Sequence, residues 1–116
     1  MPLVEVTHAP GVAESKLREV GSVLPHLVSK AVERPEEPYE GPLQPGDVEI
    51  RFRRLGPLDR SGLKVVIEVR SKWFESRAAN RQERVDRLHQ DVRTATGLRD
   101  FGVYLSLPSA AWSQGD

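Results

Sequence analysis

Strand-like and helix-like segments alternate along this 116-residue chain, and their order is what most restricts the folds open to it. Four segments alternate apolar and polar side chains or are rich in β-branched residues, which predicts strands at residues 3–8, 48–53, 63–70 and 101–107. Two segments carry apolar residues at helical spacing, at residues 13–31 and 75–96. The predicted order is therefore strand, helix, strand, strand, helix, strand.

A faint internal repeat groups these segments into two units. The run Val4-Glu5-Val6 before the first predicted helix resembles Ile67-Glu68-Val69 before the second. Each unit, residues 1–55 and 63–116, is then a βαβ element with a right-handed crossover and parallel strands. We expect one α+β domain, with a four-stranded mixed sheet and two helices on one face. A ferredoxin-like split βαβ sandwich has the same element order and is the alternative.

Glycine and proline mark the weak points and ends of these elements. Pro25 removes a backbone donor inside the first helix and predicts a kink near Gly21. Gly97 follows the second helix, where a glycine commonly ends a helix. Residues 34–47 are rich in proline and glycine, which predicts a long loop, interpreted as a solvated insertion or alternatively as a flap over a site.

Composition narrows the class of function. Lys plus Arg and Asp plus Glu both number 17, and zero net charge argues against a general nucleic-acid or membrane-surface binder. The absence of cysteine excludes disulfides and thiolate chemistry. The three histidines have no metal-ligand spacing, and no apolar run is long enough for a signal peptide or a membrane span. A cytoplasmic protein is expected.

Pro2 directly follows the initiator methionine and opens the first strand. Small residues at position two, proline included, normally allow the methionine to be removed. Pro2 would then carry a free secondary amine, whereas a proline nitrogen anywhere else is an amide without a proton. Pro2 is therefore the candidate catalytic residue. The alternative interpretation is structural, since the first residue of a strand need not donate to the ladder.

Several short motifs, taken together with Pro2, resemble those of a known family. They are Arg34-Pro35 after the first helix, Ile50-Arg51-Phe52-Arg53 in the second strand, Val69-Arg70-Ser71-Lys72 after the third, and Ala110-Ala111-Trp112-Ser113-Gln114-Gly115 in the tail. With the leading Met-Pro and the two units, they resemble the tautomerase superfamily. Its longer members include macrophage migration inhibitory factor, 5-carboxymethyl-2-hydroxymuconate isomerase and malonate semialdehyde decarboxylase. The resemblance covers nearly the whole chain but matches no single branch.

The resemblance implies a homotrimer in which Pro2 acts on a small acidic substrate. It implies substrate-binding roles for Arg70, Arg51, Lys72, Arg34 and Tyr104. A neutral secondary amine can take a proton from a carbon next to a carbonyl, and arginines can hold the carboxylate and stabilise the developing enolate. Burial and neighbouring arginines would lower the pKa of the amine from its reference value of about 8. This chemistry needs no metal or cofactor.

Two other functions remain open. The same fold could use a protonated Pro2 as an acid for hydration, dehalogenation or decarboxylation, which needs a second arginine and a water-activating acid. In a chain that keeps Met1 the Pro2 nitrogen is an amide and not a base, and the protein would be a non-catalytic tautomerase-like or ferredoxin-like binding domain.

Structural interpretations compete with the functional ones for several side chains. Arg51, Arg53, Glu49 and Glu68 could simply pair across a sheet face. Tyr104 is interpreted mainly as core. The arginines of the second helix alternate with acids, which predicts a solvated, salt-bridged face. They are Arg77, Arg81, Arg84, Arg87 and Arg93.

Overall fold

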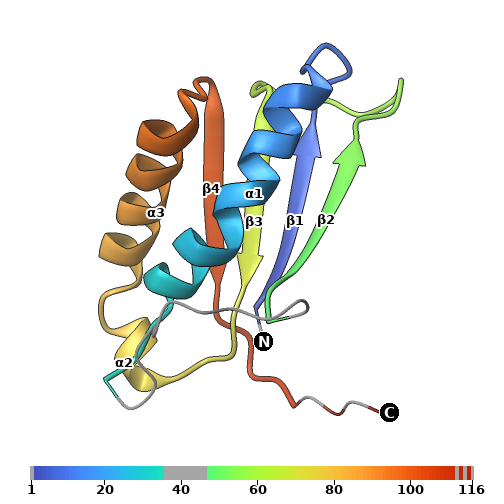
Figure 1. Ribbon diagram of the computed structural model, residues 1–116. Helices are drawn as coiled ribbons and strands as arrows, with labels where there is room; N and C mark the ends of the chain where they lie inside the picture. The colour runs from blue at the N-terminus through green and yellow to red at the C-terminus, as the bar shows by residue number, and fades with distance from the viewer. Residues whose placement is uncertain (1, 36–46, 112, 114, 116) are drawn as a thin grey trace.

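A computed structural model describes residues 2–35, 47–111, 113 and 115, and its elements follow the predicted order (Figure 1). The first unit comprises β1 (Leu3–His8), α1 (Glu14–Ala31) and β2 (Glu49–Arg54). The second unit comprises β3 (Val65–Arg70), α2 (Glu75–Ala78), α3 (Arg81–Thr96) and β4 (Phe101–Ser106). In the described segments, no helix combines the length and the apolar character needed to cross a membrane.

The four strands form one mixed sheet in the order β2-β1-β3-β4. The two strands of each unit are adjacent and parallel, and β1 and β3 are antiparallel neighbours at the centre. In the register, Val4 lies between Ile50 and Val69. Because neither unit is split by a strand of the other, the ferredoxin-like alternative is wrong. The predicted fold of two tandem βαβ units is confirmed.

The core lies between the sheet and the helices α1 and α3, which cover the same face of the sheet (Figure 1). Alternate residues of the central strands point into it, so that Val6 and Ile67 have no exposed surface. Leu24 of α1 and Leu88 of α3 pack on them and are 0% and 1% exposed. Each such side chain contributes roughly 1.5–3 kcal/mol when buried.

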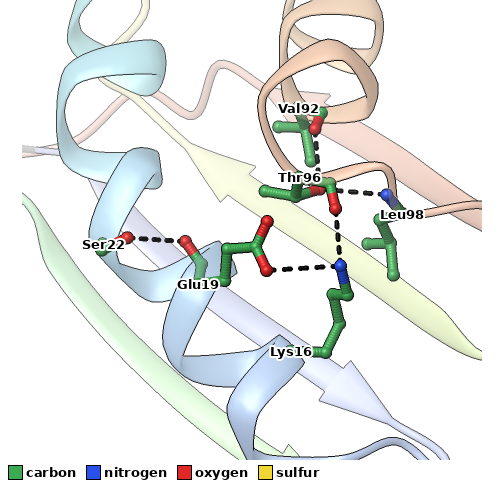
Figure 2. Close-up of polar contacts among 6 residues, drawn as sticks. All are labelled: Lys16, Glu19, Ser22, Val92, Thr96 and Leu98. Carbon is green, nitrogen blue, oxygen red and sulfur yellow. Dashed lines mark hydrogen bonds and ion pairs between the residues drawn. The ribbon is translucent and has the colours of Figure 1, made fainter.

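A lysine ties the start of α1 to the end of α3 (Figure 2). Lys16 Nζ donates to the Thr96 carbonyl over 2.6 Å and to Glu19 Oε2 over 3.3 Å. The Thr96 hydroxyl in turn donates to the Val92 carbonyl and accepts from the Leu98 amide. The bond from Lys16 satisfies the Thr96 carbonyl, which the last turn of a helix leaves without an intrahelical partner.

The outward face of the sheet is polar, and no described element packs on it. It carries the alternate residues that point away from the helices, including Glu5, Arg51, Arg53, Glu68 and Arg70. Arg53 Nη1 lies 3.6 Å from Glu5 Oε1 across β1 and β2. This cross-strand pair agrees with the structural interpretation made from the alternation.

The second predicted helix is divided, and this part of the prediction is wrong. α2 ends at Ala78, and Asn80 adopts φ −128° and ψ 37° before α3 begins. Asn80 is the N-cap residue of α3: its carbonyl accepts the Arg84 amide over 3.1 Å, and its side chain accepts a hydrogen bond from Arg84 Nε over 2.6 Å. Ala95, predicted on the apolar stripe, is exposed. Gly97 ends α3 with φ 70°, as predicted.

Gly21 has a packing role inside α1, which also contains Pro25. A Cβ atom at Gly21 would lie 3.2 Å from Cζ of Phe52, so the glycine leaves room for the ring of Phe52. Phe52 is nevertheless 43% exposed, although the alternation of β2 predicted that it faces the core. β2 is an edge strand, where the helices cover the sheet only in part.

Residues 36–46, within the predicted loop, lie outside the described residues.

Candidate functional site

Pro2 and the candidate cationic residues meet at one end of the sheet. Leu3 at the start of β1 pairs with Glu49 at the start of β2 and with Arg70 at the end of β3. The carboxyl end of α1 and the short helix α2 lie at the same end (Figure 1). The antiparallel pairing of the two units therefore places residues from the beginning, middle and end of the chain together.

A small pocket of about 50 Å³ opens at the start of β1, and Pro2 precedes its first lining residue, Leu3, without lining it. Its lining comprises Leu3, Val4, Glu5, Glu49, Arg51 and Arg70. Pro2 is half-buried, and its carbonyl accepts a 3.1 Å hydrogen bond from the Glu49 amide. Two of the predicted substrate-binding residues, Arg51 and Arg70, thus share one pocket, which Pro2 approaches through its backbone bond to Glu49.

The arginines of the outward face differ in how they are engaged. Arg70 Nη2 donates to Glu68 Oε2 over 2.9 Å, in a pair whose side chains are 51% and 38% exposed. Arg53 pairs with Glu5, whereas Arg51 makes no hydrogen bond or ion pair within the described part of the chain. An exposed ion pair is worth roughly 0–1 kcal/mol, so a ligand carboxylate can compete with Glu68 for Arg70. Arg51 is the arginine most open to a ligand.

Arg34 and Lys72 form a separate cluster around Phe74. The Arg34 guanidinium carbon lies 3.5 Å from the centre of the Phe74 ring, and Lys72 Nζ lies 5.6 Å from it. Both contacts are cation–π interactions. Neither residue lines the pocket that contains Arg51 and Arg70. The structure therefore divides the predicted substrate-binding cations into two pairs.

Tyr104 is not a core residue, and that interpretation is wrong. It is 63% exposed on the outward face of β4, where it pairs with Glu68. Arg51 lies on β2 at the opposite edge of the sheet. Within one chain, Tyr104 is therefore not brought to the pocket lined by Arg51.

Two arginines that the sequence assigned to a solvated helix face are engaged with backbone carbonyls. Arg77 is 8% exposed, and its Nε donates to the Val32 carbonyl over 2.7 Å. Arg84 Nη1 donates to the carbonyls of Ala31 and Glu33 over 2.9 and 2.7 Å. The sequence did contain a signal that Arg84 faces the protein interior. Arg84 precedes the buried Leu88 by four residues, so the two side chains lie on the same face of α3.

Cation-binding side chains do not gather at this end of the sheet. Among residues 2–35, 47–111, 113 and 115, no group of three or more His, Cys, Asp or Glu side chains could hold a metal ion.

Comparison with solved structures places this geometry in a known fold. No family model and no curated protein matches the sequence. FG41 malonate semialdehyde decarboxylase, solved with 3-bromopropiolate, is 10% identical with a TM-score of 0.65, and the match covers 98% of this chain and 89% of that one. MIF2 from Leishmania major is 14% identical with a TM-score of 0.61, and the match covers 99% and 95% of the two chains.

The chain has the tautomerase fold. Both of these proteins belong to the tautomerase superfamily. So does a fused 4-OT solved as a symmetric trimer, which is 15% identical with a TM-score of 0.59 over 92% of this chain and 85% of that one. The resemblance suggested by the short motifs is confirmed at the level of the tautomerase fold, which accounts for the two βαβ units.

Proposed function

We propose that the chain, once Met1 is removed, is a cofactor-independent tautomerase or isomerase that uses the Pro2 amine as its base. The substrate would be a small keto or unsaturated carboxylic acid. The observation that carries this proposal is the pocket at the start of β1, directly after Pro2 in the chain, which Arg51 and Arg70 line from two different strands. A carboxylate accepts charge-assisted hydrogen bonds from such guanidinium groups.

The reaction needs only a proton transfer and charge stabilisation. The neutral Pro2 amine takes a proton from the carbon next to the substrate carbonyl, and the electron pair of that C–H bond forms an enolate. Arg70 or Arg51 stabilises the oxygen on which negative charge develops. The protonated amine then returns the proton to the oxygen or to another carbon of the substrate. No atom is gained or lost.

A homotrimer is part of this proposal. The outward face of the sheet is uncovered by any described element and carries both charges and the exposed Tyr104. Such a face on a small domain is a natural surface for self-association. A second copy could also bring a Tyr104 to the pocket that the tyrosine of the same chain does not reach. The fused 4-OT with the same fold is a trimer.

One observation favours a second reaction class. Hydration, dehalogenation or decarboxylation with a protonated Pro2 requires two arginines and a carboxylate that activates water. The pocket contains Arg51 and Arg70 together with Glu5 and Glu49. A malonate semialdehyde decarboxylase with this fold, 17% identical to the chain, has both decarboxylase and hydratase activities. The two reaction classes differ in pH dependence, because a catalytic acid must be protonated and a catalytic base must be neutral.

The test compares two forms of the same chain. One form is processed to begin at Pro2, and the other retains Met1, as verified by intact mass. The two forms differ in the amine and keep every other side chain. The processed form should interconvert the keto and enol forms of phenylpyruvate or of a 2-hydroxymuconate, and the Met1 form should be at least about a hundredfold slower, the scale of losing a general base.

Two other results would contradict the proposal that the Pro2 amine is the base. Equal turnover by both forms would show that the base is a side chain. If neither form acts on any keto acid, a non-catalytic binding domain becomes the better proposal. Pro2→Ala is a weaker control, because it keeps a free primary amine.

A further inference from the structure

One buried arginine joins two segments that each carry a candidate substrate-binding cation. Arg77 is 8% exposed. Its Nε donates to the Val32 carbonyl over 2.7 Å, and its Nη1 donates to the Lys72 carbonyl over 2.9 Å. Val32 directly follows α1, and Lys72 follows β3. A single guanidinium therefore connects the ends of two elements from different βαβ units.

Phe74 brings the side chains of the same two segments together. Arg34 and Arg77 contact its ring with their guanidinium carbons 3.5 and 5.0 Å from the ring centre, and Lys72 Nζ lies at 5.6 Å. Arg34 lies two residues after the carbonyl that Arg77 holds. The position of Arg34 thus depends on both the hydrogen bond to Val32 and the ring that Arg77 packs against.

Arg84 holds the same region by a separate set of bonds. Its Nη1 donates to the carbonyls of Ala31 and Glu33, and its Nη2 donates to the Ser76 carbonyl over 3.3 Å. Arg84 fixes the end of α1 to α2, but only Arg77 reaches the segment of Lys72. The two arginines therefore have distinguishable roles.

We propose that Arg77 is a positioning residue that sets Arg34 and Lys72 for substrate binding. The inference rests on the proposed function and extends it to Arg34 and Lys72, which lie outside the pocket of Arg51 and Arg70 and for which the resemblance implies substrate-binding roles. Arg77 itself is covered by the chain and acts through the Val32 and Lys72 carbonyls and the Phe74 ring. The planar fork of arginine satisfies two carbonyls at once, which the single ammonium of lysine does not reproduce.

The test replaces Arg77 by lysine, which keeps the charge and most of the volume. For the processed chain acting on phenylpyruvate, Arg77→Lys should raise KM about tenfold and leave kcat within about twofold, as expected when binding alone is weakened. A variant that merely unfolds more easily lowers the active fraction, so it lowers apparent kcat without raising KM. Arg81→Lys is the matched control, because Arg81 is exposed on α3.

A double-mutant cycle distinguishes positioning from an unrelated structural role. If Arg77 acts through Arg34, the KM of the variant with both Arg34→Ala and Arg77→Lys should be close to that of Arg34→Ala alone. If the double variant raises KM by the product of the two single-variant factors, the proposal is wrong. An unchanged KM in Arg77→Lys would also overturn it. Both results are obtained on an active wild type and leave the proposed function standing. A processed wild type that neither turns over nor binds phenylpyruvate overturns both proposals.

Discussion

Arg70 and Glu68, two residues apart on the outward face of β3, form a hydrogen-bonded ion pair of 2.9 Å, and Arg70 also lines the pocket at the start of β1. The pair holds in place the arginine that the sequence ranked first for substrate binding. It also means that a substrate carboxylate must compete with Glu68 for that guanidinium. This competition yields a prediction of its own.

Removing the charge of Glu68 should strengthen substrate binding. Glu68→Gln leaves Arg70 without its ionised partner, and an exposed pair of this kind is worth at most about 1 kcal/mol. KM for an acidic substrate should therefore fall by up to about fivefold. Steady-state kinetics test this, with Glu83→Gln on the exposed surface of α3 as the control. A higher KM would mean that Glu68 orients Arg70 productively.

Removing Arg70 should impair the reaction itself. Arg70→Ala should lower turnover of an acidic substrate by about a hundredfold or more, the scale of losing one charge-assisted contact at a developing oxyanion. Arg51→Ala tests the second arginine of the pocket under the same conditions. Unchanged kcat and KM in Arg70→Ala would show that Arg70 is structural and would leave Arg51 as the carboxylate-binding residue.

The pH dependence should identify the protonation state of Pro2. A base must be neutral, so kcat/KM should rise with pH as the Pro2 amine loses its proton. The midpoint should lie below the reference amine value of about 8, because burial and nearby arginines disfavour the charged form. The profile is measured on the processed chain between acidic and mildly alkaline pH. A rate that falls as pH rises would support the acid mechanism.

Glycine substitutions should change stability in opposite directions at two positions. Gly21→Ala gains up to about 1 kcal/mol of helix propensity, and the half-exposed Phe52 ring can move by the few tenths of an ångström required. Gly97→Ala should destabilise by about 1 kcal/mol, because φ is 70° there. Denaturant unfolding measures both. A destabilised Gly21→Ala variant would show that Phe52 is fixed.

The chain should assemble into a homotrimer of about three times its 13.0 kDa mass. The physical reason is the uncovered outward face of the sheet, which a lone chain leaves to solvent. Sedimentation velocity at micromolar concentration measures this. Observation of monomers alone would contradict the prediction and would also remove the route by which a partner could supply Tyr104.

Local pattern was sufficient to predict the order of the elements, whereas the choice between tandem βαβ units and a ferredoxin-like sandwich needed the observed strand order. The bounds of β1 agree with the structure, and the helix end at Gly97 follows from its left-handed conformation. Strand alternation and helix periodicity depend on which side of an element faces the core, and that information lies within a few neighbouring residues. The repeat between the two units then restricted the topology, since parallel βαβ crossovers have one preferred hand.

Tertiary contacts decided the remainder. The partners of Arg77 and Arg84 are carbonyls at the end of α1, 45 and 53 residues earlier in the chain. The pocket shared by Arg51 and Arg70 depends on the pairing of β1 with both β2 and β3. The sequence alone does not show whether an arginine side chain will be solvated, will pair with a carboxylate or will donate to a buried carbonyl. The long arginine side chain takes its partner from whatever the fold brings within reach, so only the folded chain assigns these residues.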